Sequence, residues 1–520
     1  MEPVLTVPPR FEASPRECWV LLGLAAVFLV LNVATADLFP VVWVDEVMYI
    51  DPAVNLYLGH GFRSTAWPAQ PQSETWMSNS PLYQGLLFLW MQIFGFSLLT
   101  VRSFNHVLAV GLLAGIWLAV RRWRLLRRSS TRVLLMVLLA CGFGFTFIYR
   151  SGRPDLVAMM PMVLAFLASS LASPTARGLA LFCCGALVPV SGLAAGAFLL
   201  VLGGLLLVFL GRRVLVLLLS LGGGVVAGAG IWLGVLDLVG LREPFLRATL
   251  SHSSVPGQGG GSPAFFAKIA ARLGENTNAV FLDWSAVFLG LGALLVVGAL
   301  ARRRRLVLRS PMVFAVLAAV WIPTLVAAAG KYPLYYSWMA YAPLTLAFLR
   351  HREELAGGLR TVTHVAIVLA AVVGFPLQLG IALWDRQMRD YRQVERLVDE
   401  VVLEGDRVYC DFACYYPAKA RAATVFLPTY NRHFTTREMR GLDAVILRLR
   451  EPGAAYVWWA EIHPELAEEW QPTDRGVAVD RAGIRFLRFH WPYTDYRSLR
   501  VYARRAPPHP DAARRAPGRE

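Results

Sequence analysis

Two adjacent carboxylates, Asp45 and Glu46, follow the first long apolar stretch of the 520-residue sequence. A carboxylate near a membrane surface is suited to take the proton from an attacking hydroxyl group. Side chains that are neighbours in sequence rarely aim at one point. We therefore expect Asp45 to be a general base, and Glu46 to orient the surrounding loop or to bind a substrate. The simpler alternative is that both acids only face water at the membrane boundary.

Asp155 is a second candidate acid, because it stands at the mouth of a later apolar stretch where a charge is costly without a purpose. A structural ion pair with Arg153 would explain it equally well. Four cations fall near the same boundary and could hold an anionic group: Arg102, Arg150, Arg153 and Lys331. Their alternative role is to extend from helix ends towards the lipid headgroups.

The elements that must position these residues are long apolar segments. The chain is 56% hydrophobic and only 17% charged, which excludes an ordinary water-soluble enzyme. Each apolar block is about as long as a helix that crosses ~30 Å of hydrocarbon, and none reserves a polar face for water. We expect about eleven transmembrane helices, near residues 17–36, 103–120, 133–149, 154–172, 178–193, 194–210, 214–240, 284–301, 311–330, 335–350 and 361–384.

Arginines explain the net charge of +16 and set the orientation. They gather in the loops between spans, as the positive-inside rule predicts for cytoplasmic loops. Aromatic residues do not accompany these runs, so nucleic-acid binding is not expected. With the N-terminus inside and the first span kept as an uncleaved anchor, every basic loop falls on one side. The runs lie at residues 121–132, 212–213, 302–309 and 350–352.

The composition divides the chain into three parts. Residues 1–384 form the membrane module, with a first outer loop over 37–102, and residues 385–505 are expected to form a soluble α/β domain outside the cytoplasm. In that domain a helix is predicted at 391–403 and strands at 407–410, 444–447 and 455–459. Cys410 and Cys414 could pair there, although four-residue spacing is weak evidence. The Pro- and Arg-rich residues 506–520 are predicted to be a disordered tail.

The order of several short motifs resembles the GT-C glycosyltransferases, in particular the branch of protein O-mannosyltransferases and lipid A aminoarabinose transferases. The motifs are Asp45-Glu46 with Tyr49, then Ser80-Pro81-Leu82-Tyr83, then Phe94-Gly95-Phe96-Ser97, then Arg102. The resemblance is strongest over residues 40–125 and weaker over 150–155 and 331–343. It also has a departure: where the family often has Lys-Pro-Pro-Leu, this chain has Asn79-Ser80-Pro81-Leu82, so the lysine expected to help bind the donor phosphate is absent.

The resemblance implies a GT-C-type membrane enzyme that moves a sugar from a polyprenyl-phosphate donor to an acceptor outside the cytoplasm, with inversion. The leaving phosphate gains negative charge, which calls for fixed cations. Tyr335 and Tyr336 follow Lys331 as in the family, but could equally belong to an interfacial aromatic belt. The implied site residues are Asp45, Glu46 and Asp155 for catalysis, Arg102, Arg150, Arg153 and Lys331 for the donor phosphate, and Tyr49, Tyr83, Tyr335 and Tyr336 for substrate binding.

The resemblance leaves the sugar, the prenyl length and the acceptor (a protein, a lipid or a glycan) open, and it points to a bacterial inner membrane. No cofactor is expected. A divalent ion shared by Asp45, Glu46 and Asp155 is the less favoured arrangement, since no His or Cys cluster has ligand spacing. Two other classes stay open. A secondary transporter would use Asp45 and Asp155 to bind protons or cations, but no internal repeat is visible. A non-catalytic scaffold would only present the C-terminal domain.

Overall fold

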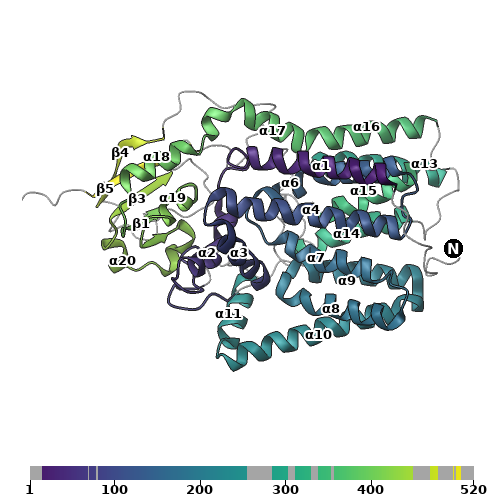
Figure 1. Cartoon of the computed structure of the whole chain (residues 1–520), viewed down its shortest axis with the longest axis horizontal. Helices are drawn as coiled ribbons and strands as arrows, with labels where there is room; N and C mark the ends of the chain where they lie inside the picture. The colour runs from purple at the N-terminus through teal and green to yellow at the C-terminus, as the bar shows by residue number, and fades with distance from the viewer. Residues whose placement is uncertain are drawn as a thin grey trace, which may run out of the picture.

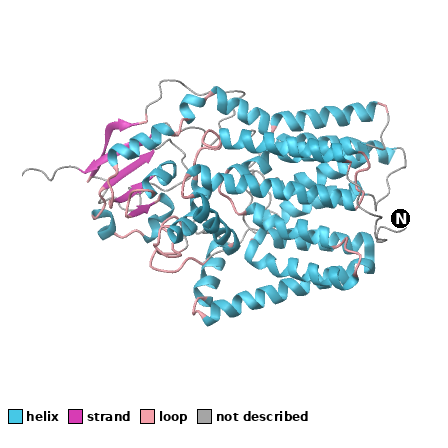
Figure 2. Ribbon diagram, in the orientation of Figure 1, coloured by secondary structure: helices cyan, strands magenta, loops and turns pink. Residues whose placement is uncertain are grey.

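The computed structural model describes residues 14–67, 70–77, 80–253, 284–302, 311–328, 338–352, 357–448, 469–477, 496 and 499–504. Helices run lengthwise through most of the molecule, and the strands gather at one end (Figures 1 and 2). This arrangement confirms the predicted class: a helical membrane module followed by a small α/β domain.

Five segments of the described chain are long and apolar enough to cross a membrane, or six if one bent pair counts as a single span. Their apolar side chains face outward, as in Leu238, which is 89% exposed. The chain is therefore a multi-pass membrane protein, while the total of about eleven spans stays a prediction. The five are α1 (Pro15–Ala34), α4 (Leu98–Arg122), α8 (Pro174–Ser191), α10 (Leu215–Leu238) and the combined α16 (Gly358–Val373) and α17 (Phe375–Trp384).

Eight more helices of this module lie in the described residues outside the first outer loop. They are α5 (Ser129–Cys141), α6 (Phe143–Arg150), α7 (Asp155–Ala168), α9 (Leu193–Leu210), α11 (Arg242–Ser253), α13 (Trp284–Arg302), α14 (Pro311–Ala328) and α15 (Trp338–Arg352).

The segment predicted as one span over 133–149 is broken, which corrects that expectation. Helices α5 and α6 meet at an angle of 63°, because Gly142 between them is extended, with ψ at 135°. The ring of Tyr341 packs against this glycine so closely that a Cβ there would lie 2.4 Å from a ring carbon. The Tyr341 hydroxyl also donates a 3.0 Å hydrogen bond to the carbonyl of Leu138. The break therefore lets α15 pack directly onto the bend.

The first outer loop contains two helices, α2 (Val44–Tyr57) and α3 (Pro81–Phe94), which the sequence did not predict. Asp45 and Glu46 occupy the first turn of α2, where the positive end of the helix dipole favours acids. Pro81 opens α3 at a position where a missing N–H costs nothing. Ser97 caps α4 by accepting a 3.0 Å hydrogen bond from the amide of Thr100.

The C-terminal domain has a five-stranded sheet in the order β2-β1-β3-β5-β4. Strands β2, β1 and β3 are parallel, while β5 and β4 run antiparallel to their neighbours. Two predicted strands and the helix are confirmed, and residues 455–459 lie outside the described residues. The elements are α18 (Arg392–Val401), β1 (Arg407–Cys410), α19 (Tyr415–Lys419), β2 (Thr424–Phe426), α20 (Thr436–Arg440), β3 (Ala444–Arg448), β4 (Trp470–Gly476) and β5 (Leu499–Arg504).

Four short 3-10 helices complete the described elements: η1 (Gly211–Val214), η4 (Arg386–Arg389), η5 (Phe412–Cys414) and η6 (Pro428–His433).

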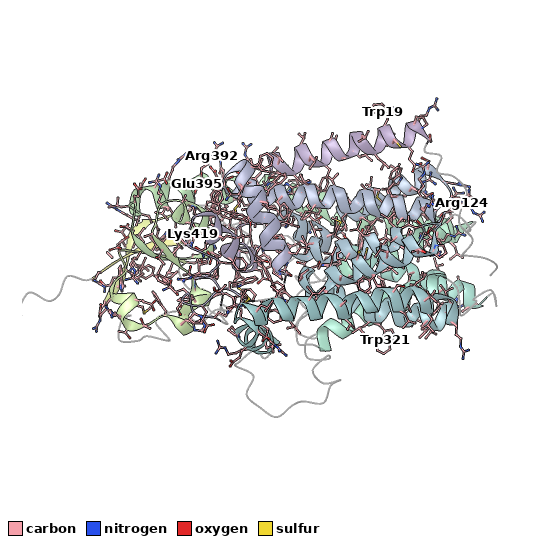
Figure 3. The ribbon with its side chains drawn as sticks, turned by 60° about the horizontal axis from the view of Figure 1, so that its bottom comes forward. Trp19, Arg124, Trp321, Arg392, Glu395 and Lys419 are labelled. Carbon is pink, nitrogen blue, oxygen red and sulfur yellow. The ribbon has the colours of Figure 1, made fainter. Side chains whose placement is uncertain are left out.

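One apolar core joins the outer helices to the C-terminal domain. Val47 of α2 and Val101 of α4 belong to the same fully buried cluster as Val398 of α18 and Val425 of β2. At the other end of the molecule lies Arg124, from the first basic loop, whereas Lys419 of the domain lies at the sheet end (Figure 3). The sheet end therefore lies opposite this arginine-rich loop.

Candidate active site

Arg153 joins the two candidate acids Asp45 and Asp155. Its Nη1 lies 2.5 Å from Oδ2 of Asp45, and its Nε lies 2.8 Å from Oδ2 of Asp155. Asp45 comes from the first turn of α2, and Asp155 is the first residue of α7. Asp45 is 25% exposed, whereas Arg153 and Asp155 are 1% and 4% exposed. Asp45 is thus a partly exposed carboxylate that forms an ion pair with the buried guanidinium group of Arg153.

Two features outside this triad fix Arg153. The rings of Trp43 and Tyr49 lie 5.7 and 5.4 Å from its guanidinium carbon, within the range of a cation–π contact. In α4 the amide nitrogen of Asn105 donates to the carbonyls of Ser151 and Arg153 at 2.6 and 3.0 Å. Asn105 thereby positions the turn between α6 and α7. The sequence analysis missed it, because a single Asn inside an apolar span gives no motif.

Glu46 and Arg102 form a second, separate pair that is completely buried. Nε of Arg102 lies 2.8 Å from Oε1 of Glu46, and Nη2 lies 2.6 Å from Oε2. The remaining Nη1 donates to the carbonyls of Ala36 and Pro40. The hydroxyl of Tyr416, from the C-terminal domain, adds a 2.9 Å hydrogen bond to Oε1 of Glu46. Glu46 is thus turned away from Asp45 and towards the protein interior.

Arg150 is likewise buried and held by acceptors of the protein. Its Nε donates to the carbonyl of Phe39 at 2.6 Å, Nη1 donates to Oδ1 of Asn32 at 2.5 Å, and Nη2 donates to the carbonyl of Thr35 at 2.5 Å. These groups belong to the last turn of α1 and the residues that follow it. Arg150 therefore satisfies carbonyls that a helix end leaves without intrahelical partners.

The two described tyrosines of the predicted site take different positions. Tyr49 lies against Arg153, as given above, and its ring centroid is 5.6 Å from that of Trp67. Tyr83 of α3 is fully buried, and its hydroxyl has no hydrogen-bond partner among the residues that the structure describes. Burial raises the pKa of Tyr83 well above its usual value, and the negative charge of Glu46 adds to the effect. Lys331, Tyr335 and Tyr336 lie outside the described residues.

The three candidate carboxylates do not converge on a common point suited to a metal ion. Glu46 is directed to Arg102, whereas Asp45 and Asp155 are directed to Arg153. Within the described part of the chain, no group of three or more His, Cys, Asp or Glu side chains could hold a metal ion.

Asp51 is a further buried carboxylate that the sequence analysis missed. Its Oδ2 accepts from the hydroxyl of Ser64 at 2.7 Å and from the amide of Thr65 at 2.9 Å. Its Oδ1 accepts from the hydroxyl of Tyr415 at 2.7 Å and lies 3.4 Å from Nζ of Lys419. Asp51 lies on the same helix as Asp45, but nothing in its sequence spacing predicts that its carboxylate is buried and bonded to the C-terminal domain.

The chain has the fold of the GT-C glycosyltransferases, as predicted from the sequence. A crystal structure of ArnT from Cupriavidus metallidurans in the apo state matches it with a TM-score of 0.61 and 14% identity, covering 94% of this chain and 98% of that chain. ArnT is a lipid A aminoarabinose transferase. A second structure of ArnT, bound to undecaprenyl phosphate, matches with a TM-score of 0.58 and 13% identity over the same shares of both chains.

No protein-family model and no curated protein matches the chain by sequence.

Proposed function

We propose that this protein is a membrane glycosyltransferase that moves a sugar from a polyprenyl-phosphate donor to an acceptor hydroxyl outside the cytoplasm. The observation that carries the proposal is the Asp45–Arg153–Asp155 arrangement on a GT-C fold. Undecaprenyl phosphate is bound in the ArnT structure of this fold, which supports a lipid-phosphate donor here.

Asp45 is the proposed general base. Of the three candidate carboxylates, Glu46 is fully buried, Asp155 is 4% exposed, and Asp45 is 25% exposed. A base must reach the proton that it removes, so Asp45 is the carboxylate that an acceptor could approach. Asp155 has a supporting role in this scheme, because it shares Arg153 with Asp45 and fixes the direction of the guanidinium. Glu46 orients the start of α2 through Arg102.

The donor phosphate is assigned to Arg153 and Lys331. All three described arginines of the predicted set are buried, and Arg102 and Arg150 donate to acceptors away from Asp45, whereas Arg153 contacts Asp45 directly. Arg153 lies beside the base, where a cation can stabilise the negative charge that develops on the leaving phosphate. Tyr49 lies against Arg153 and is assigned to substrate binding, whereas Tyr83 is fully buried and is assigned to the packing of the core.

Direct attack by one activated hydroxyl inverts the anomeric configuration, since no covalent sugar–enzyme intermediate is formed. The orientation follows from charge: the basic loop that contains Arg124 lies at the end opposite Lys419 of the C-terminal domain (Figure 3). If that loop is cytoplasmic, the site opens on the outer face. In a bacterium the membrane would be the inner membrane.

The test is transfer of radiolabelled sugar from a panel of polyprenyl-phosphate donors by purified protein, in wild type and in Asp45→Asn. Removal of a general base lowers turnover by about 10²- to 10⁴-fold, and donor binding should persist. Asp399→Asn is the matched control, because Asp399 is a half-exposed acid of α18 that pairs with Arg421. The anomeric configuration of the product, measured by NMR, tests inversion.

Equal turnover in Asp45→Asn and the wild type would remove Asp45 from the chemistry. A product that retains the anomeric configuration would contradict direct attack. Vectorial uptake of a solute by reconstituted wild-type protein that makes no glycosidic bond would replace the transferase by a transporter.

A further inference from the structure

The C-terminal domain reaches the candidate site through two consecutive tyrosines. Tyr415 and Tyr416 open α19, and Figure 1 shows α19 on the side of the sheet that faces α2. The hydroxyl of Tyr415 donates to Asp51 at 2.7 Å, and the hydroxyl of Tyr416 donates to Glu46 at 2.9 Å. Both acceptors are fully buried acids of α2, the helix that also carries Asp45.

Tyr416 contacts three parts of the outer region at once. Its hydroxyl shares Oε1 of Glu46 with Nε of Arg102. Its ring stacks on Phe96, with centroids 5.7 Å apart and planes 23° apart. Phe96 lies in the turn before α4, and Arg102 lies on α4 itself. One side chain of the domain therefore links α2 to the start of α4.

The loop after α2 is held by the same domain. The Thr65 hydroxyl donates to the carbonyl of Val425 in β2, and the Thr429 hydroxyl donates to the carbonyl of Ala66 at 2.6 Å. The amide of Gln72 donates to the Tyr430 hydroxyl at 2.9 Å. These bonds fix the loop that follows α2, while Tyr416 bonds to its first turn.

We infer that Tyr416 is a positioning residue: through Glu46 it holds the first turn of α2, and thereby sets the direction of Asp45. The inference rests on the proposed function and deepens it, because it makes the C-terminal domain part of the catalytic apparatus. Asp45 is the residue next to Glu46 in the first turn of α2, so it moves with Glu46, and catalytic groups lose rate when they shift by fractions of an ångström.

The test compares Tyr416→Phe with Tyr409→Phe. Both changes remove one hydroxyl from a fully buried tyrosine of the same domain. The Tyr409 hydroxyl donates to Asn431 within the domain, so Tyr409→Phe is the matched control for loss of a buried hydrogen bond. Two readouts are taken on the full-length protein in detergent: steady-state kinetics of sugar transfer, and hydrogen–deuterium exchange of residues 44–57.

For Tyr416→Phe we expect kcat to fall about 10- to 100-fold with KM for the donor unchanged, since a hydrogen bond to a charged group is lost. Exchange of the first turn of α2 should become faster. Tyr409→Phe should leave kcat and α2 exchange at the wild-type level. A general loss of stability would affect both variants alike, and would not lower kcat selectively while KM stays unchanged.

Equal behaviour of the two variants in both readouts would overturn the inference, as would a Tyr416→Phe variant with unchanged exchange over 44–57. If the wild type transfers no sugar, the proposed reaction fails, and the exchange comparison still decides whether the Tyr416 hydroxyl holds α2.

Discussion

Arg102 and Glu46 form a bidentate ion pair in which both side chains are completely buried, with N–O distances of 2.8 and 2.6 Å. Removal of one partner from such a pair leaves an uncompensated buried charge, which costs about 3–5 kcal/mol. We predict that Arg102→Leu lowers the free energy of unfolding by this amount, measured by thermal and denaturant unfolding in detergent. The double variant Glu46→Leu/Arg102→Leu should recover part of the loss.

The exposed pair of Arg421 and Asp399 supplies the control. Its N–O distance is 2.9 Å, but the two side chains are 44% and 48% exposed. An exposed pair contributes at most about 1 kcal/mol, so Arg421→Leu should change unfolding little. Similar losses in Arg421→Leu and Arg102→Leu would contradict the assignment of Arg102 to the fold.

Gly142, at the break between α5 and α6, gives a prediction about packing. A Cβ at this position would lie 2.4 Å from the Tyr341 ring, and the ring is fully buried with little room to move. Gly142→Ala should therefore destabilise the protein by about 1–3 kcal/mol. Gly111→Ala in α4 is the matched control, because nothing lies within 4 Å of its added methyl group. Equal melting temperatures for the two variants would show that α15 does not pack on the bend.

The class of fold could be predicted because its signals are long and repeated. Runs of apolar residues and arginine-rich loops act over the whole chain, and they define a membrane module without any tertiary information. The break at Gly142 could not be predicted in this way, since it depends on where Tyr341 packs from a distant helix. The helices α2 and α3 were missed because each has only 14 residues, too few to give a spanning signal, and their buried apolar residues join a core formed with residues far away in the chain.

The site was predicted only in part, for a related reason. Charge at a membrane boundary singled out Asp45, Asp155 and Arg153, and the structure brings these three together. The same signal could not separate Arg102 and Arg150, which donate to other protein acceptors, from Arg153, which contacts Asp45; all three are buried. Tyr415 and Tyr416, which bond to α2, could not be predicted from the sequence. Their partners lie more than 350 residues away in the chain, and a contact at that separation leaves no local sequence pattern.

Cys410 and Cys414 are both free thiols, and both are fully buried in the C-terminal domain. Burial raises the pKa of each thiol, and the charge of Asp411 adds to this effect. Because the thiolate is the reactive form, we predict very slow labelling by a membrane-impermeant maleimide at pH 7, and faster labelling as the pH rises. Denaturation without a reductant should release both thiols, as counted by mass spectrometry. A cysteine introduced by Asp399→Cys on exposed α18 should label rapidly and serve as the control.

Asp155 and Asp45 share Arg153, but they should differ in their effect on catalysis. Asp155→Asn removes the charge opposite Nε of Arg153 while the 2.5 Å contact between Nη1 and Asp45 can persist. Arg153 then keeps only one of its two ion pairs, so its guanidinium group holds the Asp45 carboxylate less firmly in place. We expect kcat for sugar transfer to fall about 10- to 100-fold, which corresponds to about 1.4–2.7 kcal/mol of transition-state stabilisation.

The comparison with Asp45→Asn decides whether Asp155 only orients. The loss in Asp45→Asn should be larger, and the double variant Asp45→Asn/Asp155→Asn should be no worse than Asp45→Asn alone, because Asp155 acts through a base that is already gone. If the losses of kcat in the two single variants multiply in the double variant, Asp155 takes part in the chemistry independently of Asp45. A loss in Asp155→Asn that exceeds the loss in Asp45→Asn would make Asp155 the base and Asp45 its partner.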